Sequence, residues 1–185
     1  MQVSATPLEG LLVIETKLWR DARGAFVETY HQDRYREAGV AAAFVQDNFS
    51  WSEANVLRGL HYQLSRPQGK LVMVVEGRVF DVAVDIRAGS PTFGQWHGLE
   101  LSAENGSQLY IPPGYAHGFY VLSERAGFMY RCTDYYSPAD ERGIRWDDPQ
   151  LAIAWPSVKP LVSQKDQDYK TLGEMRGALP RYAAV

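Results

Sequence analysis

The stretch Val79-Phe80-Asp81-Val82-Ala83-Val84-Asp85-Ile86 decides the class of fold, because its side chains alternate in character along the chain. Apolar residues occupy every second position from Phe80 to Ile86, and both aspartates fall on the opposite phase. Successive side chains of a β-strand point to opposite faces of the sheet, so a period of two is the signature of a strand. This stretch therefore predicts a β-strand with one continuous apolar face.

Shorter runs of similar character recur through the first 135 residues. Turn sequences such as Asp21-Ala22-Arg23-Gly24 and Glu104-Asn105-Gly106 separate them. Many short strands joined by such turns favour a sandwich, a jelly roll or a barrel over a parallel sheet with crossover helices. The sequence thus predicts an all-β protein, with further strands at Leu11–Glu15, Ala25–Tyr30, Phe44–Phe49, Val56–Gln63, Lys70–Glu76, Gln95–Leu101, Gln108–Ile111, Ala116–Val121 and Gly127–Thr133.

Helices are expected only at the periphery. The stretch from Gln32 to Ala38 is followed by Gly39, a suitable C-terminal cap, and a second helix from Ser163 to Leu172 can begin at a serine cap. Beyond Pro138 the alternation fades and further prolines appear. We expect a single domain spanning residues 1–185, with a β core at about 8–135 and a C-terminal segment, about 136–185, that wraps around it.

Composition narrows the classes of function. Hydrophobic residues make up 45% and charged residues 22% of the 185 residues, as in globular proteins with a buried core. The formal charge of -3 supplies no basic field for nucleic acid or for an anionic membrane. The apolar runs are shorter than the roughly 18 residues that span a bilayer, and the N-terminus does not resemble a secretory signal. With Cys132 as the single cysteine, no internal disulfide is possible, and we expect a cytoplasmic protein.

His61 is the first candidate for chemistry. Alternation along Val56–Gln63 places His61 on the same face as Gln63, and Arg58 on the opposite face. The ordinary pKa of histidine, roughly 6.5, suits proton abstraction near neutral pH if a neighbouring acceptor fixes the tautomer. A hydrogen-bonded core histidine is the alternative interpretation, and this strand taken alone favours it.

A metal site is not expected. The segment from Pro112 to His117 has the pattern Pro-x-Gly-x-x-His, which is familiar from cupin barrels, where it often supplies one metal ligand. The other cupin ligands come from a His-x-His pair and a downstream Glu on an earlier strand, and here that strand holds only His61.

Other chemistries have little support. The chain contains neither a phosphate-binding glycine loop nor a Gly-x-Ser-x-Gly elbow. Arg23, Arg58 and Lys70 lie at loop or strand ends, where they can meet an anionic ligand or remain solvated surface charges. Tyr130 shares one strand face with Phe128 and is either a packed aromatic residue or a proton donor.

Ordered segments along residues 8 to 170 together resemble one family, that of dTDP-4-dehydrorhamnose 3,5-epimerase. Each segment is short, but many of them occur in the family's order. The segments are Asp21–Glu28, Gln46-Asp47-Asn48, Val56–Gln63, Gln68–Val72, Val79–Ile86, Ser90–Gly94, Ala116–Phe119, Tyr130–Pro138 and Ser163–Asp166.

The resemblance implies a cupin-like antiparallel jelly-roll barrel, a homodimer, no metal and no organic cofactor. It implies that a dTDP-4-keto-6-deoxy sugar is inverted at C3 and C5, with dTDP-4-dehydro-6-deoxy-D-glucose giving dTDP-4-dehydro-L-rhamnose. His61 matches the family's base and Tyr130 the proton donor on the opposite face. Asp166 matches the carboxylate that pairs with the base, and Lys70 a cation near the C4 oxygen. These roles satisfy the chemistry, since a carbon-bound proton becomes abstractable only when the enolate oxygen is stabilised.

The resemblance also implies a set of residues that line the substrate site. One position departs from the family, because Met73 stands where many members have arginine, and alternation alone does not tell which way its side chain points. The implied lining residues are Arg23, Phe26, Glu28, Gln46, Asp47, Asn48, Arg58, His117, Glu141 and Lys165; Phe26 is a candidate for stacking on thymine, and its strand for contributing to a neighbour's site.

Rival functions stay open at this stage. A single-site epimerase acting at C3 or C5 of a related dTDP-keto sugar would carry nearly the same motifs. A noncatalytic cupin that binds a nucleotide sugar would keep Arg58 and Lys70 without using His61. A metal-dependent cupin oxygenase is the third alternative.

Overall fold

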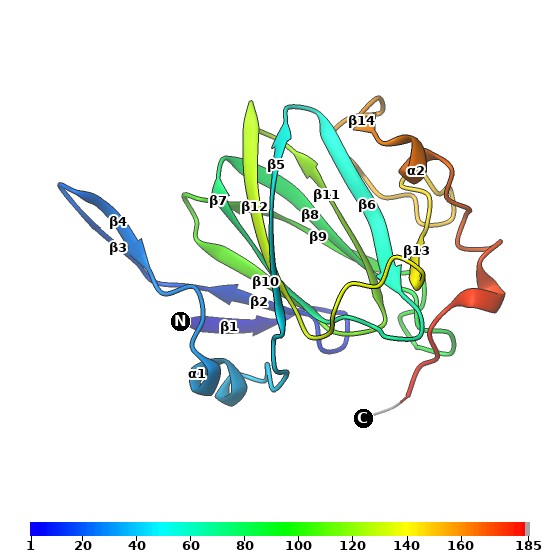
Figure 1. The fold of residues 1–185 in the computed structure, drawn as a ribbon, viewed down its shortest axis with the longest axis horizontal. Coiled ribbons are helices and arrows are strands. Elements are labelled where there is room, and N and C mark those ends of the chain that lie inside the picture. Colours follow the sequence, from blue (N-terminus) through cyan, green and yellow to red (C-terminus); the bar gives the residue numbers. More distant parts are fainter. Residues whose placement is uncertain (184–185) are drawn as a thin grey trace.

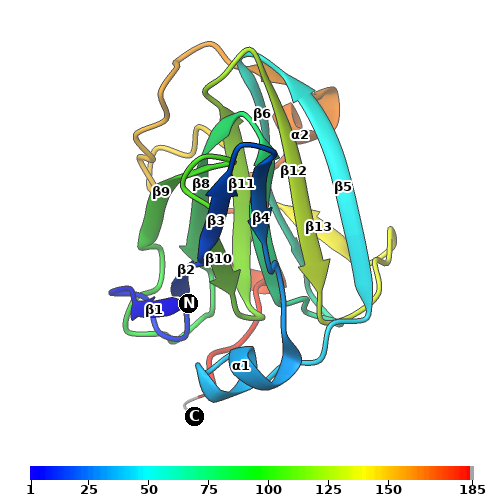
Figure 2. The ribbon, with the colours of Figure 1, turned by 90° about the vertical axis from the view of Figure 1, so that its left-hand side faces the viewer.

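Two antiparallel β-sheets face each other in the computed structural model, which describes residues 1–183 (Figures 1 and 2). Between β5 and β12 the chain passes repeatedly from one sheet to the other, which is the arrangement of a jelly roll. The first sheet has the order β1 (Gln2–Ala5), β2 (Leu12–Glu15), β10 (Ser107–Ile111), β7 (Lys70–Glu76), β12 (Arg125–Cys132) and β5 (Gln46–Glu53). The second has the order β13 (Glu141–Gly143), β6 (Val56–Gln63), β11 (Tyr115–Val121), β8 (Arg78–Asp85) and β9 (Trp96–Ser102).

Smaller elements surround this barrel. The hairpin of β3 (Leu18–Asp21) and β4 (Gly24–Val27) projects away from the two sheets (Figure 1). The short strand β14 (Leu161–Val162) runs parallel to β6 at its edge. The helices are α1 (Gln32–Glu37), α2 (Gln164–Gln167) and a 3-10 turn, η1 (Arg176–Ala178). The predicted all-β, cupin-like jelly roll with short peripheral helices is confirmed.

The stretch that predicted the fold is strand β8, and both of its faces are buried. The apolar face, with Val82 and Val84, packs beneath the C-terminal segment, whose Ile144, Leu151 and Leu172 complete that cluster. The opposite face turns toward the first sheet, where Ala83 joins a core that both sheets build. Burial on both sides explains why the two aspartates of β8 need partners inside the protein.

The C-terminal segment contains less helix than its sequence predicts. Helix α2 is capped by Ser163, whose hydroxyl accepts a hydrogen bond from the Asp166 N–H, but it ends at Gln167 instead of continuing to Leu172. The chain beyond it is held by other contacts, since the carbonyl of Lys170 accepts a hydrogen bond from the Arg145 N–H. The helix was therefore predicted too long. The predicted domain extends to residue 185, and residues 184–185 lie outside the described range.

Strand β6 contains a bulge that reverses its alternation. His61 pairs with His117 and Arg58 with Phe119, so the two residues between them on β6, Gly59 and Leu60, lie opposite the single residue Gly118 of β11. At the bulge the chains come so close that a Cβ on Gly59 would lie 2.6 Å from the Cα of Gly118. Arg58 and His61 consequently face the same way, toward the first sheet, and the prediction that they lie on opposite faces is wrong.

Candidate active site

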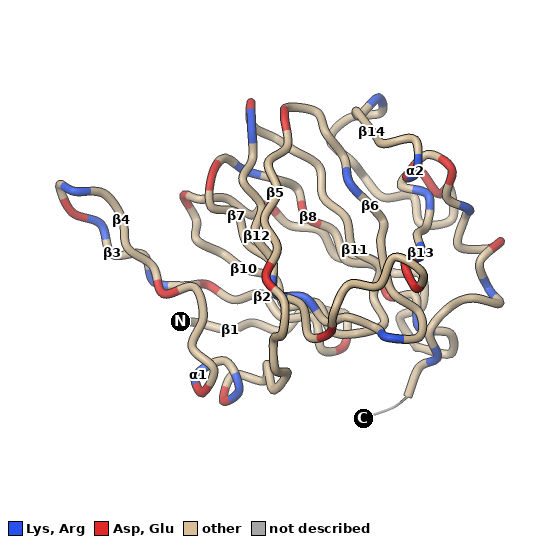
Figure 3. Tube along the Cα trace, viewed as in Figure 1, with Lys and Arg blue, Asp and Glu red and all other residues tan. Residues whose placement is uncertain are grey.

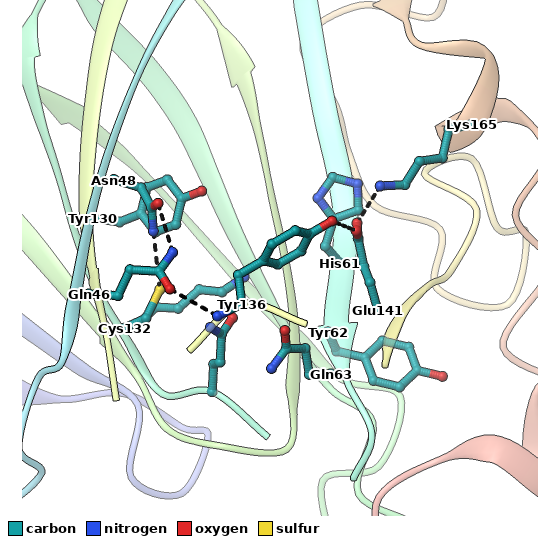
Figure 4. A pocket seen from close by; sticks show the side chains of 12 residues that line it. Gln46, Asn48, His61, Tyr62, Gln63, Tyr130, Cys132, Tyr136, Glu141 and Lys165 are labelled. Atoms are coloured by element: carbon teal, nitrogen blue, oxygen red, sulfur yellow. Dashed lines mark hydrogen bonds and ion pairs between the residues drawn. The ribbon is translucent and has the colours of Figure 1, made fainter. Parts of the chain in front are cut away.

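The pocket lies at one end of the barrel, between β5 and β12 of one sheet and β6 and β13 of the other (Figure 4). Its volume is about 350 Å³. Most of the residues around it carry a polar group, which suits a polar ligand such as a sugar. The lining residues are Gln46, Asn48, His61, Tyr62, Gln63, Gln68, Lys70, Tyr130, Cys132, Tyr136, Glu141 and Lys165.

His61 and Asp166 form a hydrogen-bonded pair on one wall. Nε2 of His61 lies 2.8 Å from Oδ1 of Asp166, and Oδ2 of the same carboxylate accepts the Gly59 N–H at 3.1 Å. Burial raises the pKa of Asp166, but the hydrogen bonds from His61 and Gly59 outweigh it, so the pKa lies below its ordinary value. An ionised carboxylate only accepts hydrogen bonds, so Nε2 carries the proton and Nδ1 holds the free electron pair.

Tyr130 stands on the wall opposite His61 (Figure 4). It extends from β12, and its ring packs against the core through Phe128, with ring centroids 6.0 Å apart. Burial raises the pKa of the Tyr130 hydroxyl, and Arg58 opposes that shift. The phenol is therefore protonated near neutral pH and can donate to a ligand in the pocket.

Lys70 supplies a cation to the same space. It is the first residue of β7 and pairs in register with Cys132 of β12. Burial lowers the pKa of Lys70, while the nearby Cys132, Asp81 and Glu141 oppose the shift. A lowered pKa makes the ammonium group a stronger proton donor to an oxygen atom in the pocket.

A second His–Asp pair lies behind these groups. Nε2 of His117 is 2.9 Å from Oδ2 of Asp81, and both side chains are buried. Burial lowers the pKa of His117, with further lowering from Lys70 and His61 and opposition from Asp81. His117 is thereby a neutral neighbour of the site, on the strand paired with β6.

Glu141 organises the rim of the pocket on the side of His61. Its carboxylate accepts hydrogen bonds from Lys165 Nζ at 2.5 Å and from the Tyr136 hydroxyl (Figure 4). Burial raises the pKa of Glu141, but these hydrogen bonds outweigh it and the net shift is downward. Across the pocket, Nε2 of Gln46 donates to Oδ1 of Asn48 at 2.9 Å. The rim thus offers amide and charged groups to a polar ligand.

Some residues implied by the resemblance are not in the pocket of this chain. Arg23 and Phe26 belong to the projecting β3–β4 hairpin, and Phe26 is 69% exposed. Glu28 pairs with Arg34, and Asp47 with Arg131 on the outer side of β12. Arg58 lies nearer the site. Its Nε donates to Ser52 Oγ of β5 at 2.9 Å, bridging the two sheets.

Met73 also lies away from the pocket. The amide nitrogen of Gln108 is 3.6 Å from its sulfur, and Gln108 is buried beneath helix α1 with Tyr35. The departure from the family at Met73 therefore removes no cation from the pocket of its own chain.

Sequence reasoning assigned no role to five of the lining residues. Alternation with His61 was a usable signal for Gln63, which lies two residues further along the same strand. Tyr136 follows β12 in a segment without periodicity, so no pattern pointed to it. The five residues are Tyr62, Gln63, Gln68, Cys132 and Tyr136.

Two features are absent from the described residues. No group of three or more His, Cys, Asp or Glu side chains in residues 1–183 is placed to hold a metal ion. Within the same range, no helix is long and apolar enough to cross a membrane.

Figure 3 shows acidic and basic residues interspersed along the trace, including the β3–β4 hairpin.

The arrangement suits the movement of protons at carbon. An imidazole held by a carboxylate faces a protonated phenol across one pocket, and an ammonium group lies in the same pocket. On a keto sugar, removal and return of a proton from opposite faces inverts a carbon centre. The fold and the pocket together define a jelly-roll carbohydrate epimerase.

The chain belongs to the dTDP-4-dehydrorhamnose 3,5-epimerase family, whose model matches residues 5–174. The dTDP-4-dehydrorhamnose 3,5-epimerase of Pseudomonas aeruginosa is 51% identical over 176 residues, which cover 94% of this chain and 97% of the relative. The crystal structure of dTDP-6-deoxy-D-glucose-3,5-epimerase from Legionella pneumophila, in complex with dTDP-4-keto-L-rhamnose, matches with a TM-score of 0.96 at 54% identity and covers 99% of each chain. The dTDP-4-dehydrorhamnose 3-epimerase of Streptomyces niveus is 42% identical over 187 residues, which cover 99% of this chain and 90% of the relative.

Proposed function

We propose that this chain inverts C3 and C5 of dTDP-4-dehydro-6-deoxy-D-glucose and so produces dTDP-4-dehydro-L-rhamnose for dTDP-L-rhamnose biosynthesis. The observation that carries the proposal is the placement of the His61–Asp166 pair and Tyr130 on opposite walls of one pocket. Family membership supports the same reaction and the same class of substrate. The proposal extends to the roles of the individual residues.

His61 is the base. Nδ1 removes the proton from the carbon next to the C4 ketone, and Asp166 stabilises the imidazolium through Nε2–H. The electron pair of the broken C–H bond forms a carbon–carbon double bond, and the carbonyl pair moves onto the C4 oxygen as an enolate. Lys70 stabilises that enolate with its ammonium group, a contribution typically worth on the order of 100-fold in rate or more.

Tyr130 is the acid. Its O–H bond breaks, the proton adds to the carbon from the face opposite His61, and the C4 ketone forms again. The electron pair stays on the phenolate oxygen until water returns a proton to it, while His61 releases its own proton. Inversion at the second carbon repeats this cycle, and because protons alone are transferred, the residues need no organic cofactor for it.

The nucleotide end binds at the rim of the pocket. Glu141, Lys165, Gln46 and Asn48 supply polar groups there, and Arg58 a cation. His117 supports the site from behind through its hydrogen bond with Asp81.

We further propose a homodimer in which the β3–β4 hairpin of each protomer completes its partner's site. Arg23, Phe26, Glu28 and Asp47 lie outside the pocket of their own chain, so a second copy explains why the family places them at the substrate. The exposed aromatic pair Phe49 and Trp51 on β5 offers apolar surface for such a contact. Sedimentation analysis tests the dimer, and a monomer at micromolar concentration would contradict it.

The proposed setting is a single domain acting in the cytoplasm. Cys132 is buried as a free thiol, which fits a reducing compartment. A nucleotide-sugar substrate fits the same location.

A single-site epimerase is the second candidate, because a 3-epimerase is among the relatives. The test is incubation with dTDP-4-dehydro-6-deoxy-D-glucose in heavy water, with deuterium at C3 and C5 followed by proton NMR and His61→Asn as the inactive control. Exchange at both carbons with inverted product supports the double epimerase. Exchange at one carbon supports the single-site enzyme, and binding without exchange supports a noncatalytic nucleotide-sugar protein.

A further inference from the structure

Tyr169 contacts the base without lining the pocket. It follows α2, the helix that carries Asp166, in the segment beside β13 and β6 (Figure 1). The rings of Tyr169 and His61 meet edge to face, with centroids 5.9 Å apart and an interplanar angle of 73°. The C-terminal segment therefore touches the imidazole in two ways, through the Asp166 carboxylate and through the Tyr169 ring.

Gly143 provides the space in which that ring lies. Gly143 pairs with His61 across the β13–β6 ladder. A Cβ on Gly143 would lie 2.1–2.4 Å from three atoms of the Tyr169 ring, far inside van der Waals contact. The backbone of Gly143 lies outside the left-handed region, so the backbone conformation itself would accept a side chain. The Tyr169 ring is therefore the obstacle to a side chain at this position.

Further contacts hold Tyr169 in place. Its hydroxyl donates to Oε1 of Glu141 at 3.4 Å, a long hydrogen bond. The next residue is Lys170, whose carbonyl accepts the Arg145 N–H at 3.0 Å. The ring is thus confined between β13 and the imidazole by backbone and side-chain contacts.

We propose that Tyr169 is a positioning residue for His61, an inference that rests on the proposed function. Rotation of an imidazole about its Cβ–Cγ bond is broad, so one hydrogen bond to Asp166 leaves the ring free to tilt. The edge contact from Tyr169 limits that tilt, keeps Nε2 on Asp166 and keeps Nδ1 directed to the substrate. Misplacement of a reacting group by about 1 Å can cost on the order of 100-fold in rate.

Three variants and one control test this role. Tyr169→Ala should lower kcat about 10- to 100-fold and change KM less than about 2-fold, because orientation of the base is lost and binding is kept. Tyr169→Phe keeps the ring and should restore kcat to within about 2-fold of wild type. Gly143→Ala should lower kcat as Tyr169→Ala does, because the added methyl group displaces the ring. Tyr182→Ala removes another C-terminal tyrosine, one that stacks on Arg87, and should leave kcat unchanged.

The double variant Gly143→Ala with Tyr169→Ala gives the sharpest comparison. If the methyl group acts only by displacing the ring, the double variant should be no slower than Tyr169→Ala alone. Losses that multiply would overturn the proposal. So would full kcat in Tyr169→Ala, an equal loss in Tyr169→Phe, or an equal loss in Tyr182→Ala.

A measurement that needs no turnover separates this inference from the proposed function. In ¹⁵N-labelled protein, the His61 ring of the wild type should show a single Nε2–H tautomer, and Tyr169→Ala should show tautomer averaging. An unchanged His61 signal would overturn the positioning role even if the substrate differs from the one proposed. Tyr169→Leu, which keeps apolar bulk without an aromatic edge, replaces the alanine variant if that variant does not fold.

Discussion

Replacement of Asp166 by asparagine should reverse the tautomer of His61. The two carboxylate oxygens have different partners, since Oδ1 accepts from His61 Nε2 at 2.8 Å and Oδ2 accepts from the Gly59 N–H at 3.1 Å. A backbone N–H only donates, so the single oxygen of an asparagine amide must face Gly59. Its NH₂ group must then donate to Nε2, which places the proton of the neutral imidazole on Nδ1 and removes the base.

The expected loss follows from that reversal. In the serine-protease triad, the wrong tautomer of the catalytic histidine lowers kcat about 10⁴-fold. We therefore expect kcat of Asp166→Asn to fall on the order of 10³- to 10⁴-fold. This corresponds to about 4 to 5.5 kcal/mol of transition-state stabilisation. The fold should survive, because the Ser163 cap binds the backbone N–H of residue 166 and not its side chain.

The assay is turnover and deuterium exchange of the dTDP-keto sugar, with the His61 tautomer read by ¹⁵N NMR. Asp168→Asn is the matched control, since Asp168 is exposed on the same segment and its carboxylate accepts from Gln164. The control should keep wild-type kcat. If Asp166→Asn keeps kcat within about tenfold of wild type, the carboxylate does not set the tautomer and the assignment of the dyad is wrong.

Three further perturbations should give equally distinct results. Lys70→Met should lower kcat about 100-fold or more, measured by turnover, while the Kd of dTDP changes little, because the ammonium group acts on the enolate. Phe26→Ala should raise KM about 3- to 10-fold, because the proposed stacking of Phe26 on the nucleotide base in the partner's site is lost. The Tm should be unchanged, since the Phe26 side chain is 69% exposed in its own chain. The pKa of Asp166 is lowered in the folded protein, so its stabilising contribution is present above about pH 4 and is lost as the pH falls through the folded pKa. Urea unfolding should therefore show wild type losing more stability than Asp166→Asn as the pH falls below about 4, and parallel pH profiles would contradict this.

The strands were predictable because burial imposes a period of two on their sequences. Val79–Ile86 shows that period and forms β8, displaced by one residue. The predicted strand Phe44–Phe49 instead lies at Gln46–Glu53, and its exposed aromatic end, with Trp51, carries no burial pattern that marks its limit. Strands β1 and β3 were missed, because each is four residues long and largely exposed.

Less of the site than of the strands could be predicted from sequence patterns. The bulge at Gly59 depends on close approach to Gly118 of another strand, so the orientation of Arg58 is a property of the pairing and not of the local sequence. Tyr136 and Tyr169 reach the site from irregular segments, where no periodicity marks a functional side chain. The resemblance to the family named the residues that converge on His61, and the structure explains why the hairpin residue Phe26 does not join them within one chain.

The central claim is that His61 and Tyr130 act from opposite faces of the sugar, and Tyr130→Phe tests it most directly. With the dTDP-keto sugar in heavy water, this variant should still exchange deuterium into the substrate, because His61 and Lys70 remain, while formation of inverted product should fall at least about 100-fold. Normal yield of the inverted product from Tyr130→Phe would contradict the account.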